Sequence, residues 1–307
     1  MIPLRQALED YLQIRRRLGF QLKTDQLLLE NCVGFLEQAG AVRITTELAL
    51  MWARLPVEAR PHRWRQRLGV VRGFARFLAT IDPDSEVPSI DLLPAHCPRV
   101  APYIYSPAEI TALLDAAGRL TPLLRAASYR TVIGLMATTG LRLGEALGLE
   151  RQDVDLGDGV LHVRARQSKQ REVALHPSTI TALREYARQR DQRWPQPLSP
   201  AFFLNLRGDR LAKSEFNHYF AKLIGQVGLE GAGERVRPRP HDLRHTMAVR
   251  TLLDWIKAGE DVDRRMPELS TFLGHAQPES TYWYLQAVPE LMALISQRLE
   301  GLPEVLS

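Results

Sequence analysis

The chain is 307 residues long, and 45% of its residues are hydrophobic while 24% are charged. A chain of this length and apolar content can fill the cores of two ordinary domains, which excludes a disordered or fibrous protein. Its 40 Lys and Arg residues outnumber its 35 Asp and Glu residues, a mild basic excess whose meaning depends on where the charges lie.

The cysteines and the apolar segments bear on the cellular compartment. Cys32 and Cys97 lie far apart and form no CxxC pair, which is typical of reduced thiols in a cytosolic protein. No apolar run follows a basic start, and no segment approaches the ~20 apolar residues that a membrane-spanning helix needs. We therefore expect a cytoplasmic protein without a membrane partner.

Residues 4–79 carry apolar side chains three and four positions apart, with breaks at Gly19, Gly40, Pro56 and Pro61. This spacing predicts about four amphipathic helices joined by short turns. Between residues 54 and 76, seven arginines stand against one acid, Glu58. Such a cluster suits a polyanion better than a small acidic metabolite, with a solvated helix face as the alternative. The seven are Arg54, Arg60, Arg63, Arg65, Arg67, Arg72 and Arg76.

Residues 81–107 contain six prolines, which prevent a continuous helix and favour extended chain. We place a linker here and expect a helical domain at residues 1–98 and a second domain at residues 99–307. Residues 153–177 read as an antiparallel hairpin, because apolar and polar residues alternate on both sides of a polar tip. Pro177 then suits the first turn of another helix. The expected fold class is mainly α (α+β), with a small antiparallel sheet in the second domain.

Four short stretches of the second domain carry polar chemistry. In "TGLRLGE", Arg142 lies at a helix junction with Glu145 one turn further on, where an ion pair between them is the simpler explanation. In "HDLRH", Arg244 lies on a helix between two histidines, His241 and His245.

The other two stretches are "LGH" and the tip of the hairpin. His275 ends the first of these, and Tyr284 follows it nine residues later. The hairpin tip holds Arg166 and Lys169. Taken alone, the tyrosine would be a core residue and the hairpin tip a soluble loop.

The two histidines of "HDLRH" raise the possibility of a metal site. They lie at positions i and i+4, yet no Asp, Glu or Cys at ligand spacing completes the site, and Arg244 would repel a cation. We expect no metal and no other cofactor.

Together these residue types suit phosphoryl transfer to a tyrosine. Paired arginines donate to phosphate oxygens and neutralise the charge of a five-coordinate transition state. Tyrosine has a pKa near ~10, so its deprotonation at pH 7 costs about 4 kcal/mol, and arginine charge with a nearby histidine can lower that cost. A lysine on a hairpin can protonate the leaving sugar oxygen.

The order and spacing of these motifs resemble the tyrosine recombinase (phage integrase) family over about residues 105–290. The resemblance implies a helical core-binding (SAM-like) DNA-binding domain at residues 1–98 and a catalytic domain with a C-terminal tail helix at residues 99–307. It also implies that Arg142 and Arg244 bind phosphate, that His241 and His275 assist proton movement and phosphate binding, and that Tyr284 is the nucleophile. Glu145 matches a supporting acidic position.

Two assignments have competitors within this sequence. Ungapped counting puts the family's catalytic lysine on Arg166, whereas a hairpin shortened by two residues puts it on Lys169. We prefer Lys169, because arginine is too weak an acid to protonate a departing oxygen. Tyr282 competes with Tyr284, but residues two apart on a helix point to nearly opposite sides, and the spacing from His275 favours Tyr284.

The implied activity is site-specific DNA recombination through a 3′-phosphotyrosyl intermediate, without metal or ATP. Its implied partners are double-stranded DNA and further copies of the chain, as a tetramer on DNA near the nucleoid, in the service of a mobile element or the chromosome. The alternatives are a type IB topoisomerase, a catalytically inactive DNA-binding accessory protein and a histidine-based phosphodiesterase. Residues 288–307 could dock on a neighbouring protomer or pack within their own chain.

Overall fold

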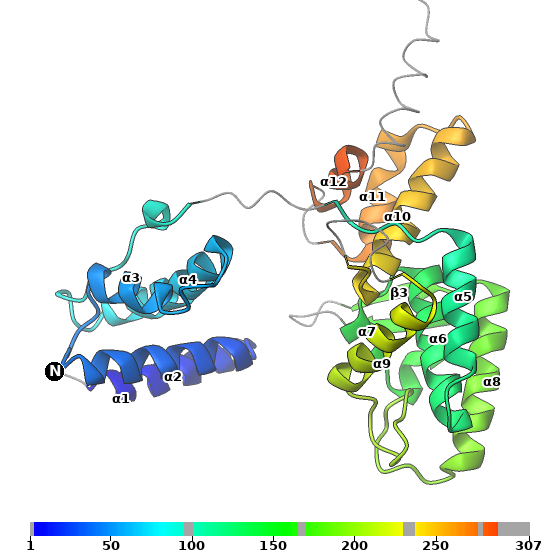
Figure 1. Cartoon of the computed structure of the whole chain (residues 1–307), viewed down its shortest axis with the longest axis horizontal. Coiled ribbons are helices and arrows are strands. Elements are labelled where there is room, and N and C mark those ends of the chain that lie inside the picture. Colours follow the sequence, from blue (N-terminus) through cyan, green and yellow to red (C-terminus); the bar gives the residue numbers. More distant parts are fainter. Residues whose placement is uncertain (1–2, 95–100, 165–169, 230–236, 276–278, 288–307) are drawn as a thin grey trace, which may run out of the picture. The chain divides into compact units, whose positions relative to one another are not determined.

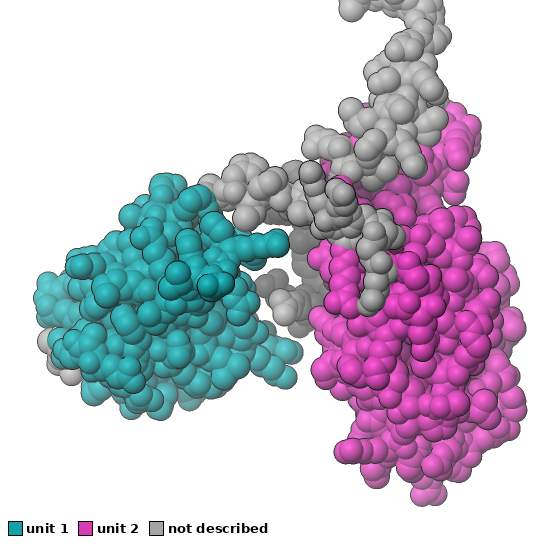
Figure 2. Space-filling model, in the orientation of Figure 1, with its two compact units in different colours: residues 1–99 teal, residues 100–307 magenta. Residues whose placement is uncertain are grey.

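The computed structural model describes residues 3–94, 101–164, 170–229, 237–275 and 279–287, and the chain divides into two units, residues 1–99 and 100–307 (Figure 1, Figure 2). Each unit has its own hydrophobic core, and the second unit has a further small cluster at its C-terminal end. No helix in these described ranges is both long enough and apolar enough to cross a membrane.

The first unit is built from helices, as the apolar spacing predicts. Its described elements are α1 (Leu4–Arg17), α2 (Lys23–Gln38), α3 (Thr46–Arg54), α4 (Pro61–Leu78) and the 3-10 turn η1 (Ile90–Leu92). Thr45 caps α3 by accepting a hydrogen bond from the backbone N–H of Leu48, and Pro61 occupies the first turn of α4. Trp52 lies fully buried in the core between these helices.

In the second unit, other helices pack around one buried helix, α6, and three short strands form a small sheet (Figure 1). The described elements of this unit are α5 (Pro107–Gly118), α6 (Leu123–Thr139), α7 (Leu143–Gly148), η2 (Arg151–Asp153), β1 (Val154–Asp155), β2 (Val160–Arg164), β3 (Gln170–Ala174), α8 (Pro177–Arg193), α9 (Lys213–Gln226), α10 (Pro240–Lys257), α11 (Val262–Leu273) and α12 (Glu279–Ala287).

Helix α6 packs against α5, α8 and α10 and buries side chains on most of its circumference, as expected of a helix that is apolar on several faces. The three strands form an antiparallel sheet in the order β1-β2-β3, and Leu161 pairs with Val173. Leu161 and Val163 are buried while His162 between them is exposed, so the alternation that predicts the hairpin is confirmed.

Helices α6 and α11 both end at a glycine. Gly140 ends α6 with φ 64° and Gly274 ends α11 with φ 67°, a left-handed conformation that other residues adopt at a cost. A side-chain β-carbon at Gly140 would lie 2.8 Å from Leu273 Cδ2. The end of α6 and the end of α11 are therefore in direct contact.

Candidate active site

Three arginines from separate elements converge on the C-terminal end of α11. The last carbonyls of a helix have no partner within it, and cations are stabilised there. Each arginine donates to a different one of three consecutive carbonyls: Arg171 Nε to Phe272 at 3.0 Å, Arg244 Nη2 to Leu273 at 2.7 Å, and Arg142 Nη2 to Gly274 at 3.2 Å. Residues from α7, β3 and α10 thus meet at one place.

Arg244 lies deepest of the three. Its side chain comes from the second turn of α10, is only 1% exposed, and also donates from Nη1 to the Gly140 carbonyl at 2.8 Å. Burial, together with the charge of Arg142, lowers the pKa of Arg244 to about 10, so the group remains cationic at pH 7. Because its acceptors among the described residues are two carbonyls and the Tyr284 hydroxyl, and not carboxylates, its charge is not cancelled by an ion pair.

Arg142 is the N-cap residue of α7 and its side chain is 39% exposed. Its Nη1 donates to Glu145 Oε1 at 2.7 Å, which is the ion pair that the spacing predicts, and its backbone N–H donates to the other oxygen at 3.0 Å. Arg171 of β3 holds the same carboxylate through Nη2 at 2.8 Å. Burial raises the pKa of Glu145, but the two arginines outweigh it and bring the pKa to about 2.

His241 and His275 flank the arginines and are neutral at pH 7. Burial first, and then the charges of Arg244 and Arg142, lower the pKa of each imidazole to about 4. His241 lies in the first turn of α10, next to its Pro240 start. His275 follows the end of α11, and its Nδ1 lies 2.6 Å from Thr281 Oγ1 of α12.

Tyr284 of α12 lies in the small core formed by α10 and α11, and only 2% of it is exposed. Burial raises the pKa of its hydroxyl, and the charges of Arg244 and Arg142 counteract that rise. Tyr282, two residues earlier, is 39% exposed. The two tyrosines therefore lie on different sides of α12, and it is Tyr284 that faces the arginines.

The sequence predicted no catalytic or phosphate-binding role for two residues of this cluster, although it raised His245 as a possible metal ligand. His245 lies one helical turn after His241, and its Nδ1 is 3.0 Å from the Tyr284 hydroxyl oxygen. Arg171 joins Glu145 to the Phe272 carbonyl. The signal for His245 was its position in "HDLRH", whereas only its place on a strand directed inward could have singled out Arg171 among the basic residues of the hairpin.

Three sequence predictions fall on residues outside the described ranges. Arg166 and Lys169, the two candidates for the lysine position, belong to residues 165–169 at the tip between β2 and β3. The predicted tail helix belongs to residues 288–307. Their roles stay predictions.

The seven arginines of residues 54–76 do not form one uniform face. Arg67 stacks over the Trp52 ring at 3.8 Å and donates to the Trp52 carbonyl, and Arg72 is 8% exposed and donates to the carbonyls of Pro88 and Ser89. These two side chains therefore bond within the first unit. The other five include exposed side chains, namely Arg54, Arg60, Arg63 and Arg76.

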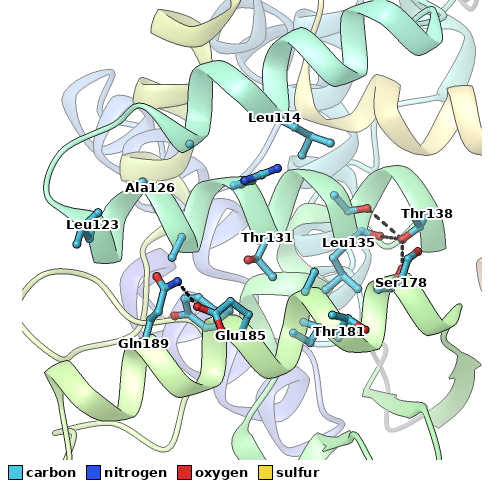
Figure 3. A pocket seen from close by; sticks show the side chains of 18 residues that line it. Leu114, Leu123, Ala126, Thr131, Leu135, Thr138, Ser178, Thr181, Glu185 and Gln189 are labelled. Atoms are coloured by element: carbon cyan, nitrogen blue, oxygen red, sulfur yellow. Dashed lines mark hydrogen bonds between the residues drawn. The ribbon is translucent and has the colours of Figure 1, made fainter.

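Other places in the chain offer less chemistry. Among the described residues, no group of three or more His, Cys, Asp or Glu side chains could hold a metal ion. A mostly apolar hollow of about 700 Å³ lies between α5, α6 and α8, lined by residues such as Leu114, Leu135 and Leu183 (Figure 3). None of the predicted site residues lines it.

Comparison with known proteins identifies the family of the chain. The model of the phage integrase family matches residues 105–290. The putative integrase/recombinase y4rB of Sinorhizobium fredii (strain NBRC 101917 / NGR234) is 42% identical over 307 residues, which cover 98% of each chain. The tyrosine recombinase XerC of Chlamydia trachomatis serovar L2 (strain ATCC VR-902B / DSM 19102 / 434/Bu) is 28% identical over 222 residues, 72% of this chain and 65% of that protein.

Solved structures share the fold. The XerH site-specific recombinase bound to a palindromic difH substrate, in a post-cleavage complex, superposes with a TM-score of 0.68 at 17% identity, covering 91% of this chain and 80% of that one. The likeness thus extends over both units of the chain. The chain therefore belongs to the phage integrase family, the tyrosine recombinases, which are site-specific DNA recombination enzymes.

Proposed function

We propose that this recombinase cuts and rejoins DNA through Tyr284, whose hydroxyl attacks a phosphodiester to give a 3′-phosphotyrosyl link and a free 5′-hydroxyl. The supporting observation is that Arg142, Arg244 and Tyr284, which are distant in sequence, meet at the end of α11. Energy of the broken bond is kept in the phosphotyrosyl ester, so rejoining requires no ATP.

Arg142 and Arg244 are the proposed phosphate-binding pair. Arg142 is partly exposed while Arg244 is buried. Arg142 can therefore bind an incoming phosphate first, and Arg244 can donate further hydrogen bonds from the protein side. A guanidinium has five N–H donors, and two of those on Arg244 are used by carbonyls. Fixed donors aimed at developing negative charge stabilise a transition state without a metal ion.

Residues next to the two arginines have supporting roles in the proposed reaction. Glu145 orients Arg142, and His241 and His275, neutral at pH 7, share hydrogen bonds with the phosphate or move protons. The leaving 5′-oxygen takes a proton from a basic residue of the hairpin, for which Lys169 is preferred over Arg166. Only 2% of Tyr284 is exposed, so groups that cover its hydroxyl must move aside before a diester reaches it.

Our proposals for DNA binding and for the assembly of several copies rest on the family to which the chain belongs. We propose that residues 1–98 form a core-binding domain, that residues 99–307 form the catalytic domain with a tail helix, and that four copies act together on two duplexes in the cytoplasm at the nucleoid. Arg54, Arg60, Arg63, Arg65 and Arg76 are the proposed contacts to the DNA backbone, where affinity falls as salt rises. Light scattering of the protein with a recombination-site duplex tests the number of copies.

Trapping the covalent intermediate tests the chemistry. A duplex nicked close to the cleavage site loses its short 5′-fragment, so a phosphotyrosyl adduct accumulates and is visible as a slower band on a denaturing gel. We expect the adduct with the wild type and with Tyr282→Phe, and none with Tyr284→Phe. An adduct with Tyr284→Phe would refute the assignment of the nucleophile. Absence of any wild-type adduct on its own site would favour an inactive accessory protein, and relaxation of plasmid without strand exchange would favour a topoisomerase.

A further inference from the structure

We propose that His245 is a further catalytic residue, which accepts the hydrogen bond of the Tyr284 hydroxyl and takes its proton as the hydroxyl attacks phosphorus. This inference rests on the function proposed above. Its basis is the 3.0 Å contact between His245 Nδ1 and the Tyr284 oxygen, a distance at which a proton can pass directly.

The direction of this hydrogen bond is assigned from the other contact of the hydroxyl. Tyr284 also shares a hydrogen bond with Arg244, and because a guanidinium only donates, the phenol oxygen accepts there and its own proton is available to His245 Nδ1. We assign Nδ1 as the acceptor, which makes the imidazole the tautomer with its proton on Nε2. An unprotonated nitrogen therefore already faces the atom that is to become the nucleophile.

Packing holds the His245 ring in this orientation. Its ring lies edge-on to the His241 ring, with 4.6 Å between the ring centroids. The centroids of the Trp283 and Tyr284 rings lie 5.7 Å and 5.4 Å from that of His245. His275 has a different bond, because its own Nδ1 lies 2.6 Å from Thr281 Oγ1. The geometry thus favours His245 over the other histidines as the group that meets the phenol.

The charges around His245 make its basicity depend on DNA. Burial first, and then His241, Arg244 and Arg239 of α10 and its cap and His275 after α11, lower the pKa of His245 to about 3. At pH 7 these histidines are neutral, and the two arginines supply the positive charge that His245 faces. Without DNA the phenol keeps its proton. A bound diester places a negative charge on Arg142 and Arg244, which offsets this cationic field and raises the basicity of His245 when the nucleophile is needed.

The proposed step exchanges one phosphate ester bond for another. The bond from the Tyr284 oxygen to phosphorus forms while the bond from phosphorus to the 5′-oxygen breaks, and the phenol proton moves to His245 Nδ1. The leaving 5′-oxygen receives its proton from the hairpin residue proposed above, which acts as an acid, and not from His245. Reversal of both transfers rejoins the strand.

A substrate with a bridging sulfur in place of the 5′-oxygen separates the two transfers, because a thiolate leaves without protonation. The adduct-forming rates of the full chain are measured on matched oxygen and sulfur duplexes for the wild type, His245→Ala, His245→Gln and Lys169→Ala. We expect His245→Ala to slow both substrates by ~10²–10⁴-fold, and sulfur to rescue Lys169→Ala alone. His218→Ala, an exposed histidine of α9, is the control and should match the wild type.

The Gln variant separates proton transfer from mere positioning. Its side-chain oxygen can accept the phenol hydrogen bond but cannot take the proton at neutral pH. We expect it to keep the wild-type thermal midpoint and DNA affinity, to stay slow on both substrates, and to lose the rise of rate with pH that a base gives as it deprotonates in the complex.

Other outcomes would overturn the proposal. Wild-type rates in His245→Ala, or full activity in His245→Gln, would show that no proton passes to this residue. Rescue of His245→Ala by sulfur would move His245 to the leaving-group side. If the wild type forms adduct and these results appear, the inference fails while the proposed function stands, whereas a wild type without adduct on its own site would remove both.

Discussion

Replacing Arg171 by Met should weaken the second unit, because it removes one of the two cations on a buried carboxylate. The side chains of Arg171 and Glu145 are 11% and 9% exposed. The pKa of Glu145 falls from 4.5 to about 2, and Arg171 is the strongest of the groups that lower it. At ~1.4 kcal/mol per pH unit, that shift corresponds to roughly 3 kcal/mol, and we expect a loss of about 2–3 kcal/mol at pH 7.

Urea unfolding of the wild type and the variant at several pH values checks this magnitude. A carboxylate with a lowered folded pKa adds stability above its unfolded pKa, and that stability is lost as pH falls through the folded value. The difference between the two proteins should therefore be full at pH 7 and should narrow as pH falls below about 4.5 toward 2. Adduct formation should slow as well, since Glu145 then holds Arg142 with less support.

Arg188→Met is the matched control. Arg188 forms the same kind of ion pair with Glu185 on α8, and the pKa of Glu185 is also lowered to about 2, but both side chains are exposed to solvent, which screens the pair. We expect little change in its unfolding. Equal losses in the two variants, or a loss in Arg171→Met that does not depend on pH, would refute the reasoning that burial gives the Arg171 pair its strength.

Three further predictions concern separate parts of the molecule. Arg244→Ala should nearly keep DNA affinity but reduce the adduct rate by ~10²–10³-fold, because one contact is a small share of binding and a large share of transition-state stabilisation; gel shifts and the nicked duplex compare the two losses. Gly140→Ala should lower the free energy of unfolding by about 1–3 kcal/mol, since the φ of Gly140 is 64° and a β-carbon there would lie 2.8 Å from a methyl group of the buried Leu273. Gly144→Ala, on α7 with no atom near the added β-carbon, should leave stability unchanged or raise it, and thermal melts compare the two variants. Arg72→Ala should lower the thermal midpoint, while Arg76→Ala should instead weaken DNA binding and reduce its salt dependence, which salt titration measures.

The fold was largely predictable because its signals are local. Apolar spacing and the breaks at glycine and proline mark α1 to α4, and alternation marks β2 and β3. The short 3-10 turn η1 inside the proline-rich segment was not foreseen, since Ser89, which accepts a hydrogen bond from Asp91 at its start, carries no periodic pattern.

The site was predictable only in part. The pair of Arg142 and Glu145 is a contact within one helical turn, and spacing therefore predicts it. The contacts of Arg171 with Glu145 and of His245 with Tyr284 join residues that are 26 and 39 positions apart. Such contacts depend on how α10, α11, α12 and the sheet pack, which no local pattern states. The same holds for Arg67 and Arg72, whose internal bonds cannot be told from basic surface charge in the sequence.

The carbonyls at the end of α11 explain how so much positive charge can gather without being cancelled. Arg142, Arg171 and Arg244 bring three charges and Glu145 removes one, which leaves +2 around the Leu273 carbonyl. Carbonyl dipoles compensate in part for the hydration that these buried cations lose, and they do so without neutralising the charges. A phosphodiester carries one negative charge, and its five-coordinate transition state carries two when attacked by a phenolate. The excess of the cluster therefore matches the transition state better than the bound substrate, and that difference is what accelerates a reaction.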